Sequence, residues 1–292
     1  ESAEHIRRAS DLINEKTSTF CGIERPCHSV MEITEEMVKS WGPLALVGSG
    51  PCCGDFSFCK EGPPRYPGQE VGRKGLNGRT GRLFRQLIII LGWVLKHNPQ
   101  CTLFTECVVF DDMTDDWNEV CAALGQPHIL NAKDFSYTRR HRAYWTRNLD
   151  LPEDFGALEA PNQLDPNDMM DSGRVIIPRS ESHPHGPGNV NTIAGSWSGD
   201  PQQPKANTVR PVMVRDDRCT EPQHLRVAEA ERLLGLPGEW TAPAGTARDR
   251  MRLIGSGWDI NVVRKFLEHY REQTLEKQTT CMHTQTLARA LT

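Results

Sequence analysis

The feature that most constrains this chain is an alternation of short apolar runs with longer segments of helical periodicity. Residues 44–47 and 102–109 have the length and composition of buried strands, and residues 81–97 between them place apolar side chains three and four positions apart. A further helical segment at 115–124 and a short apolar run at 128–130 continue the pattern. Strands separated by helices form a parallel sheet covered by helices, so we predict an α/β fold. Ligands of such folds bind beyond the carboxyl ends of the strands.

A proline-rich segment divides the chain. Ten prolines between residues 151 and 222 interrupt any long periodicity, so this segment is either a linker or a loop-rich, partly β module. The apolar runs at 175–177 and 212–214 favour the module. Helical periodicity returns at 227–236, 246–254 and 259–275. We therefore predict a first part of the core at 1–150, the module at 151–222, the C-terminal part of the core at 223–271 and a polar tail at 272–292.

Composition excludes several classes of protein. Hydrophobic residues make up 37% of the 292 residues, which with the glycines suffices for a globular core. No segment approaches the roughly 18–20 consecutive apolar residues of a membrane helix, and the first residues lack the pattern of a secretory signal. The ten cysteines include no C-x-x-C pair, so we predict reduced thiols and no metal site. The formal net charge of -4 does not indicate a general polyanion binder.

Two segments nevertheless concentrate positive charge. Residues 60–85 contain seven Lys or Arg against two Glu, and residues 137–147 interleave four arginines and a histidine with Tyr and Trp. Basic residues mixed with aromatic residues hold phosphates and stack on bases. The two segments are therefore either nucleic-acid contacts or ordinary solvated faces.

A thiol follows the first predicted strand on a tight loop. Residues 50–57 read Gly-Pro-Cys-Cys-Gly-Asp-Phe-Ser, and such a loop presents either a nucleophile or a small buried side chain. The next strand carries Glu106 towards its carboxyl end, which in a doubly wound sheet places Glu106 near Cys53. Arg140 and Arg142 alternate along the chain, so on a strand they point to the same side.

Together with further segments in the same order, this loop resembles that of the cytosine carbon-5 DNA methyltransferases, most closely the catalytic domain of the animal de novo enzymes. Counting without gaps from Trp41 places the family's cysteine at Cys53, and Cys52 stands where the family has proline. The strand around Glu106 resembles the family's Glu-Asn-Val strand, with Cys107 in place of asparagine. The other matching segments are 73–84, the paired arginines at 140 and 142, 171–174, 231–237 and 252–258, so the resemblance extends to about residue 270.

The resemblance implies a Rossmann-like, S-adenosylmethionine-dependent methyltransferase sheet, with a small, loop-rich target recognition region at 151–222. It implies that the thiol of Cys53 adds to carbon 6 of a flipped cytosine, which lets carbon 5 accept a methyl group. Glu106 would act at ring nitrogen 3, and Arg142 would position the base or the thiol. Arg140 would support the catalytic site electrostatically.

The same resemblance implies the partners of the chain. The substrate would be double-stranded DNA, and the phosphate contacts would come from Arg73, Lys74, Arg79 and Arg82. The segment Ser256-Gly257-Trp258 resembles the last motif on the cofactor side of the family. We also expect a nuclear location, association with a second copy or with a related chain, and no membrane partner.

The cofactor half of the resemblance is incomplete. The family's first strand and its Phe-x-Gly-x-Gly loop have no counterpart, and Glu1 aligns with the acidic residue that binds the ribose hydroxyls. We therefore expect the sequence to begin after the first βα unit. Ser29 falls near the position of the adenine-binding aspartate, and Ala45 stands where an acidic strand residue is usual.

Two other classes of function stay open. One is a non-catalytic DNA-binding regulator on the same fold, which is expected to have lost the pair Cys53 and Glu106. The other is an unrelated thiol enzyme that uses Cys53 with a histidine. His141 lies between the two arginines, and no histidine of the chain has a recognisable partner motif.

Overall fold

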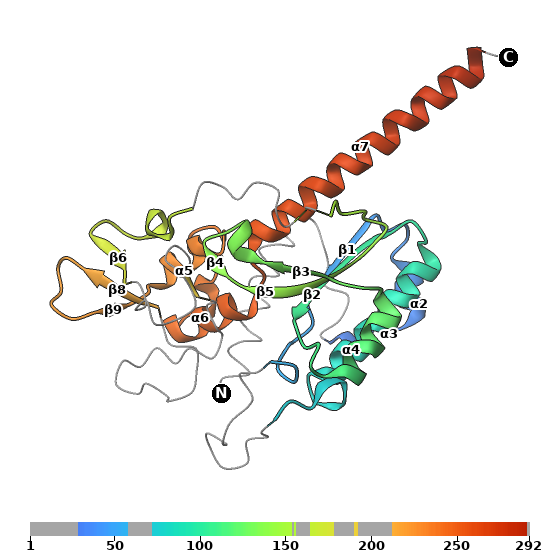
Figure 1. The fold of residues 1–292 in the computed structure, drawn as a ribbon. Helices are drawn as coiled ribbons and strands as arrows, with labels where there is room; N and C mark the ends of the chain where they lie inside the picture. The colour runs from blue at the N-terminus through green and yellow to red at the C-terminus, as the bar shows by residue number, and fades with distance from the viewer. Residues whose placement is uncertain are drawn as a thin grey trace.

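A four-stranded sheet forms the centre of the molecule in the computed structural model, which describes residues 29–57, 72–153, 155, 164–177, 190–191 and 212–290 (Figure 1). The strand order is β1, β2, β5, β3. These strands span Leu46–Ser49 (β1), Thr102–Val108 (β2), His141–Arg147 (β5) and His128–Asn131 (β3). With helices packed on this sheet, the predicted α/β class is confirmed.

The sheet is mixed, whereas the sequence pattern predicted a parallel one. β1 and β2 are parallel, with Gly48 opposite Phe104. β5 lies between β2 and β3 and is antiparallel to both, with Tyr144 opposite Glu106 on one side and His128 on the other. Only residues 132–140 connect β3 to β5. A parallel crossover needs about a dozen residues or more, so this connection forces an antiparallel return.

Three helices lie together beside the sheet: α2 (Glu35–Ser40), α3 (Gly81–His97) and α4 (Thr114–Leu124) (Figure 1). The bounds of α3 are those predicted from its periodicity. Its buried side chains include Phe84, which packs in one cluster with Cys107 of β2 and with Ala143 and Trp145 of β5. Because side chains of a strand alternate between faces, the odd-numbered residues of β2 and β5 face α3 and α4.

The opposite face of the sheet packs against α7 (Ile260–Ala290). Tyr144 of β5 joins Val262 and Phe266 of this helix in a second cluster, and the ring of Phe104 stacks on that of Phe266 with centroids 5.7 Å apart. Glu106 shares the alternation of Phe104, so its side chain lies on the α7 face. The helix was predicted to end near residue 275, but it continues to Ala290 and projects from the body (Figure 1). Within the described residues, no helix has the length and apolarity needed to span a membrane.

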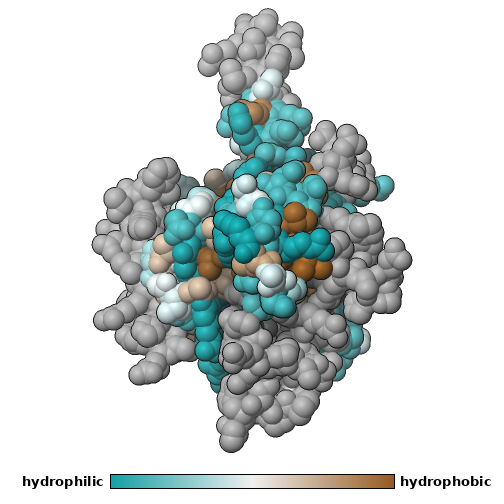
Figure 2. Space-filling view, turned by 90° about the vertical axis from the view of Figure 1, so that its left-hand side faces the viewer, coloured by the Kyte–Doolittle hydropathy of each residue, from teal (hydrophilic) through white to brown (hydrophobic). Residues whose placement is uncertain are grey.

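A smaller antiparallel sheet forms the second lobe, with strands β6 (Arg174–Ile176), β8 (Met213–Asp216) and β9 (Gln223–His224). It packs against α5 (Val227–Leu233) and α6 (Ala247–Ser256) through a core that includes Val214, Leu233 and Ile254. The apolar runs predicted as strands at 175–177 and 212–214 overlap β6 and β8. The face shown in Figure 2 is mostly hydrophilic over its described part, with apolar residues scattered among polar ones.

Short elements complete the described structure. Strands β4 (Thr138–Arg139) and β7 (Val190–Asn191) pair in parallel. The single-turn helices are η1 (Val30–Glu32), η3 (Gly75–Asn77), η4 (Ala132–Asp134), η5 (Pro166–Met169) and η6 (Ala242–Ala244).

Candidate active site

The cysteine loop begins directly after β1 and is closed by a tight turn. The backbone N–H groups of Phe56 and Ser57 donate to the carbonyl of Cys53 at 3.0 and 2.9 Å. The ring of Phe56 is fully buried and lies 4.5 Å from that of Phe110, centroid to centroid. This aromatic anchor leaves Cys52 exposed and Cys53 partly buried. The two neighbouring thiols therefore differ in environment.

Asp55 fixes the same loop to the start of α3, a role that the sequence analysis missed. One carboxylate oxygen of Asp55 accepts hydrogen bonds from the N–H of Thr80 at 2.6 Å, from its hydroxyl at 2.5 Å and from the N–H of Gly81 at 3.2 Å. A helix N-terminus favours such a carboxylate because its first N–H groups lack helical partners. The backbone carbonyl of Asp55 also accepts from the N–H of Gly75. Thr80 and Gly81 mark the start of the predicted helix in the sequence. The sequence does not show that Asp55 accepts hydrogen bonds from their N–H groups.

A buried carboxylate lies beside two arginines. Nε of Arg142 is 2.7 Å from Oε1 of Glu106, and Nε of Arg140 is 4.0 Å from the same oxygen. The guanidinium of Arg142 also donates to the carbonyl of His141 at 2.7 Å. Oε1 of Glu106 is within ion-pair distance of Arg142, but the geometry there is not that of a hydrogen bond. Among the described residues, neither this oxygen nor Nε of Arg140 has a hydrogen-bond partner. The site therefore contains buried polar atoms that a polar ligand or water can satisfy.

The thiol of Cys53 interacts electrostatically with Arg142, Arg140 and Glu106. Burial raises the pKa of Cys53, and the positive charge of Arg142 opposes that shift most strongly, followed by that of Arg140. The negative charge of Glu106 acts in the same direction as burial. The structure thus brings the four residues predicted to be catalytic into one site, from the loop after β1, from β2 and from the 140–142 segment.

Cys107 is a poor alternative nucleophile although it follows Glu106. Its side chain packs in the core on the α3 face of the sheet, and burial raises its pKa well above the ordinary value. A thiol kept neutral and enclosed is inert towards a ligand on the other face.

The predicted cofactor segment lies beside the cysteine loop. Gly257 ends α6, with its N–H donating to the carbonyls of Leu253 and Ile254. The indole of Trp258 packs on Phe104 with ring centroids 5.1 Å apart, and it also covers Gly50, where any Cβ would overlap the indole ring. The turn therefore meets the carboxyl end of β1. It fits as one wall of a site for an organic cofactor, because it offers an indole and the exposed hydroxyl of Ser256 next to a glycine.

Ser29, another predicted cofactor residue, lies in a different part of the structure from this turn. Ser29 caps η1, where its hydroxyl accepts from the N–H of Met31 at 3.2 Å, and η1 lies against α3. No contact within the described residues links Ser29 to the 256–258 turn. Glu1 lies outside the described residues.

The four predicted DNA contacts divide into two groups. The guanidinium of Arg73 is 5% exposed, donates to the carbonyl of Phe56 at 2.7 Å and forms a two-pronged ion pair with Asp112. This pair lowers the pKa of Asp112. Arg73 is thus engaged inside the protein, where it ties the cysteine loop to the segment after β2. Lys74, Arg79 and Arg82 are exposed.

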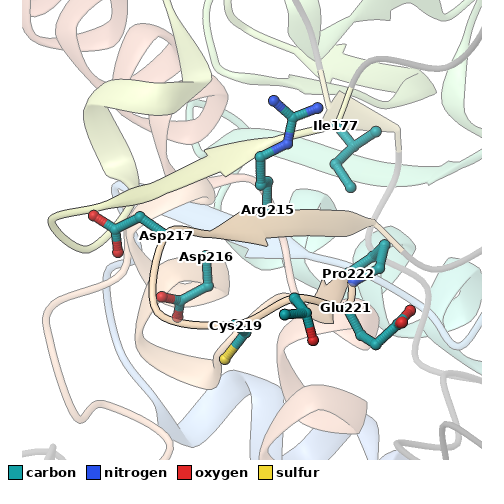
Figure 3. Close-up of a pocket in the computed structure, with 8 residues that line it drawn as sticks. Ile177, Arg215, Asp216, Asp217, Cys219, Glu221 and Pro222 are labelled. Atoms are coloured by element: carbon teal, nitrogen blue, oxygen red, sulfur yellow. The ribbon is translucent and has the colours of Figure 1, made fainter.

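A separate hollow of about 370 Å³ lies in the second lobe, between the β8–β9 connection and the end of β6 (Figure 3). Its lining includes Ile177, Arg215, Cys219 and Pro222, and none of the residues predicted to be catalytic or cofactor-binding. The hollow is therefore not part of the cluster around Cys53.

No family model matches this chain. Three solved structures are similar to it over most of both chains. The methyltransferase EhMeth of Entamoeba histolytica has 14% identity and a TM-score of 0.59, over 88% of this chain and 86% of that one. The S. pombe Dnmt2 methyltransferase has 16% identity and a TM-score of 0.56, over 93% and 96%. A mutant DNMT2 of Spodoptera frugiperda has 14% identity and a TM-score of 0.51, over 83% and 84%. Sequence identities this low show similarity of fold alone. We conclude that the chain has the fold of these methyltransferases.

Proposed function

We propose that this chain is a methyltransferase that acts on carbon 5 of cytosine in double-stranded DNA, with Cys53 as the nucleophile. One observation carries the proposal: a partly buried thiol, a buried carboxylate and two arginines meet at the carboxyl ends of two parallel strands. The sequence resemblance and the fold of the methyltransferases described above support the same reaction. The resemblance to the animal de novo branch and a nuclear place of action stay predictions.

The thiol of Cys53 forms a bond to carbon 6 of the cytosine ring, and the electron pair of the 5,6 double bond becomes available at carbon 5. The proton of the thiol passes to the Glu106 carboxylate, and Glu106 delivers a proton to ring nitrogen 3, so that Glu106 ends as the carboxylate it was at the start. Because burial keeps Cys53 protonated at neutral pH, this exchange leaves no net new charge in a nearly buried site. Arg142 holds the Glu106 carboxylate in place throughout.

S-adenosylmethionine supplies the methyl cation when it is bound, and Ser256, Gly257 and Trp258 would hold it. After carbon 5 has accepted the methyl group, a water molecule takes the carbon 5 proton and the carbon–sulfur bond breaks with its electron pair on sulfur. The proton on ring nitrogen 3 returns through Glu106 to the thiolate, which restores the aromatic ring and the thiol. The target base must leave the helical stack for this chemistry. The exposed Lys74, Arg79 and Arg82 are suited to hold the flanking phosphates.

Trapping with 5-fluorocytosine tests the proposal, because fluorine at carbon 5 blocks the last step and preserves the covalent bond. The protein is incubated with a duplex containing this base and with S-adenosylmethionine, and the product is examined by denaturing gel and mass spectrometry. We expect an adduct at Cys53 that is lost in Cys53→Ser and retained in Cys52→Ser. An adduct retained in Cys53→Ser and lost in Cys52→Ser would move the nucleophile to Cys52. No adduct and no methyl transfer would contradict the proposed function.

A further inference from the structure

The carboxylate of Asp259 is buried directly before the start of α7, two residues after Gly257. Asp259 is 1% exposed. One of its oxygens accepts a hydrogen bond from the hydroxyl of Thr138 at 2.8 Å, and the other accepts from the N–H of Asn261 at 3.1 Å. The second contact caps the start of α7, while the first reaches 121 residues back along the chain to β4.

Capping alone does not explain a carboxylate at this position. Neutral Ser, Thr and Asn cap helices about as well as Asp, and they avoid the cost of burying a charge. Burial indeed raises the pKa of Asp259, while its hydrogen bonds with Thr138 and Ser136 and the positive charge of Arg140 oppose the rise. The one cation among the causes of this shift is Arg140, a residue of the site itself.

The guanidinium of Arg140 lies between the turn at residues 256–258 and the carboxylate of Glu106. Its Nη2 donates to the carbonyl of Gly257 at 2.6 Å, and its Nη1 lies 3.5 Å from the carbonyl of Gly255. Its Nε faces Oε1 of Glu106 at 4.0 Å. Residues two apart on extended backbone point to the same side, so Thr138, which holds Asp259, and Arg140 share one side of the chain.

We propose that Asp259 is a positioning residue: its hydrogen bonds with Thr138 and with the N–H of Asn261 fix the segment of Arg140 against the turn of Gly257, and this holds the guanidinium of Arg140 between Gly257 and Glu106. This inference rests on the proposed function for its effect on catalysis. Its effect on the environment of Cys53 does not depend on that function, because Arg140 is among the charges that lower the pKa of Cys53.

Two variants separate positioning from capping. Asp259→Asn keeps the size of the side chain and an oxygen for the cap, but it replaces the oxygen that accepts from Thr138 with an NH2 group and removes the negative charge. Thr138→Val removes the hydroxyl that holds Asp259 and leaves the cap intact. Thr102→Val is the matched control, because Thr102 is a buried strand residue with a single side-chain hydrogen bond, to the carbonyl of Asn148 at 3.3 Å, away from the site. All variants carry Cys52→Ser, so that Cys53 is the labelled thiol of the loop.

The first measurement needs no methyl transfer. Iodoacetamide labelling of Cys53 is followed by mass spectrometry across a range of pH. With Arg140 released, Cys53 loses stabilisation of its thiolate, so we expect labelling at fixed pH to slow by about twofold or more in both variants and to stay unchanged in Thr102→Val. A labelling profile equal to wild type in both variants would overturn the proposal, even if their melting temperatures fell, because a cap alone affects only stability.

The second measurement is methylation. We expect kcat to fall about 10- to 100-fold in Asp259→Asn and Thr138→Val with KM little changed, because a small displacement of a positioned group affects the chemical step. Unchanged kcat in Thr138→Val would count against positioning, and that variant remains informative if Asp259→Asn does not fold. If wild-type protein transfers no methyl group, the proposed function fails, but the labelling experiment still decides the role of Asp259.

Discussion

Nε of Arg142 lies 2.7 Å from Oε1 of Glu106, and the two side chains are only 12% and 9% exposed. Glu106 is on β2 and Arg142 on β5, so the pair crosses the antiparallel junction of the sheet. Removing one partner of a buried ion pair leaves an uncompensated charge, which is costly. The ion pair with Arg142 therefore helps to fix the position of the Glu106 carboxylate within the sheet.

Replacing Glu106 by Gln should lower the rate of methylation about 100- to 10,000-fold, because an amide cannot deliver the proton to ring nitrogen 3. Affinity for the duplex should be nearly unchanged, since Glu106 is buried and the proposed phosphate contacts are made by exposed basic residues. Single-turnover kinetics and a binding titration measure the two quantities. Glu119→Gln is a suitable control, as Glu119 is exposed on α4 and pairs with Arg85. Normal turnover in Glu106→Gln would remove this residue from the mechanism.

The reactivity of Cys53 should depend on pH in a defined direction. Burial raises its pKa, so iodoacetamide labelling should rise with pH and reach half of its plateau above the value of free cysteine, about 8.5. Arg142 is the charge that most opposes this shift, so Arg142→Gln should move the labelling profile further towards alkaline pH and slow labelling near neutrality. Arg82→Gln, on the exposed side of α3, should leave the profile in place. A shift towards acid in Arg142→Gln would show that another group governs the thiol.

Asp55→Ala should destabilise the fold by about 1–3 kcal/mol, because the N–H groups of Thr80 and Gly81 lose their buried acceptor. Urea unfolding measures this change in the free energy of unfolding. Asp115→Ala removes an exposed acidic residue from the first turn of α4 and should cost much less. Equal changes in the free energy of unfolding for the two substitutions would mean that Asp55 contributes only the ordinary interaction of an acidic residue with a helix N-terminus.

Neutralising Lys74, Arg79 and Arg82 together should weaken binding to all duplexes alike. Each lost phosphate contact should reduce the slope of log affinity against log salt concentration by about 0.9 on B-form DNA. Fluorescence anisotropy at several salt concentrations measures the slope, and Arg264→Gln on the exposed side of α7 is the control. A change in sequence preference with an unchanged slope would show that these side chains read bases. We expect Arg73→Gln to act differently, by loosening the cysteine loop that it holds.

The sequence by itself determined several of the elements, among them α3 and β2, and the approximate place of the site. The periodicity at 81–97 predicted α3 with its observed bounds, and the run at 102–109 predicted β2 to within one residue. Helical and strand periods are local properties of a chain, so a single sequence is enough to show them. The meeting of Cys53 with Glu106 could also be predicted, because the carboxyl ends of neighbouring parallel strands share one edge of a sheet.

Tertiary structure alone decided the relationships that join distant residues. The antiparallel course of β5 follows from a short connection and the pairing that it permits. The ion pair of Arg73 with Asp112 gives a predicted DNA contact a partner within the protein, 39 residues along the chain. The buried hydrogen bond between Thr138 and Asp259 likewise has no local signature. Such contacts depend on which side chains the folded sheet brings together, and no periodicity of the sequence encodes that choice.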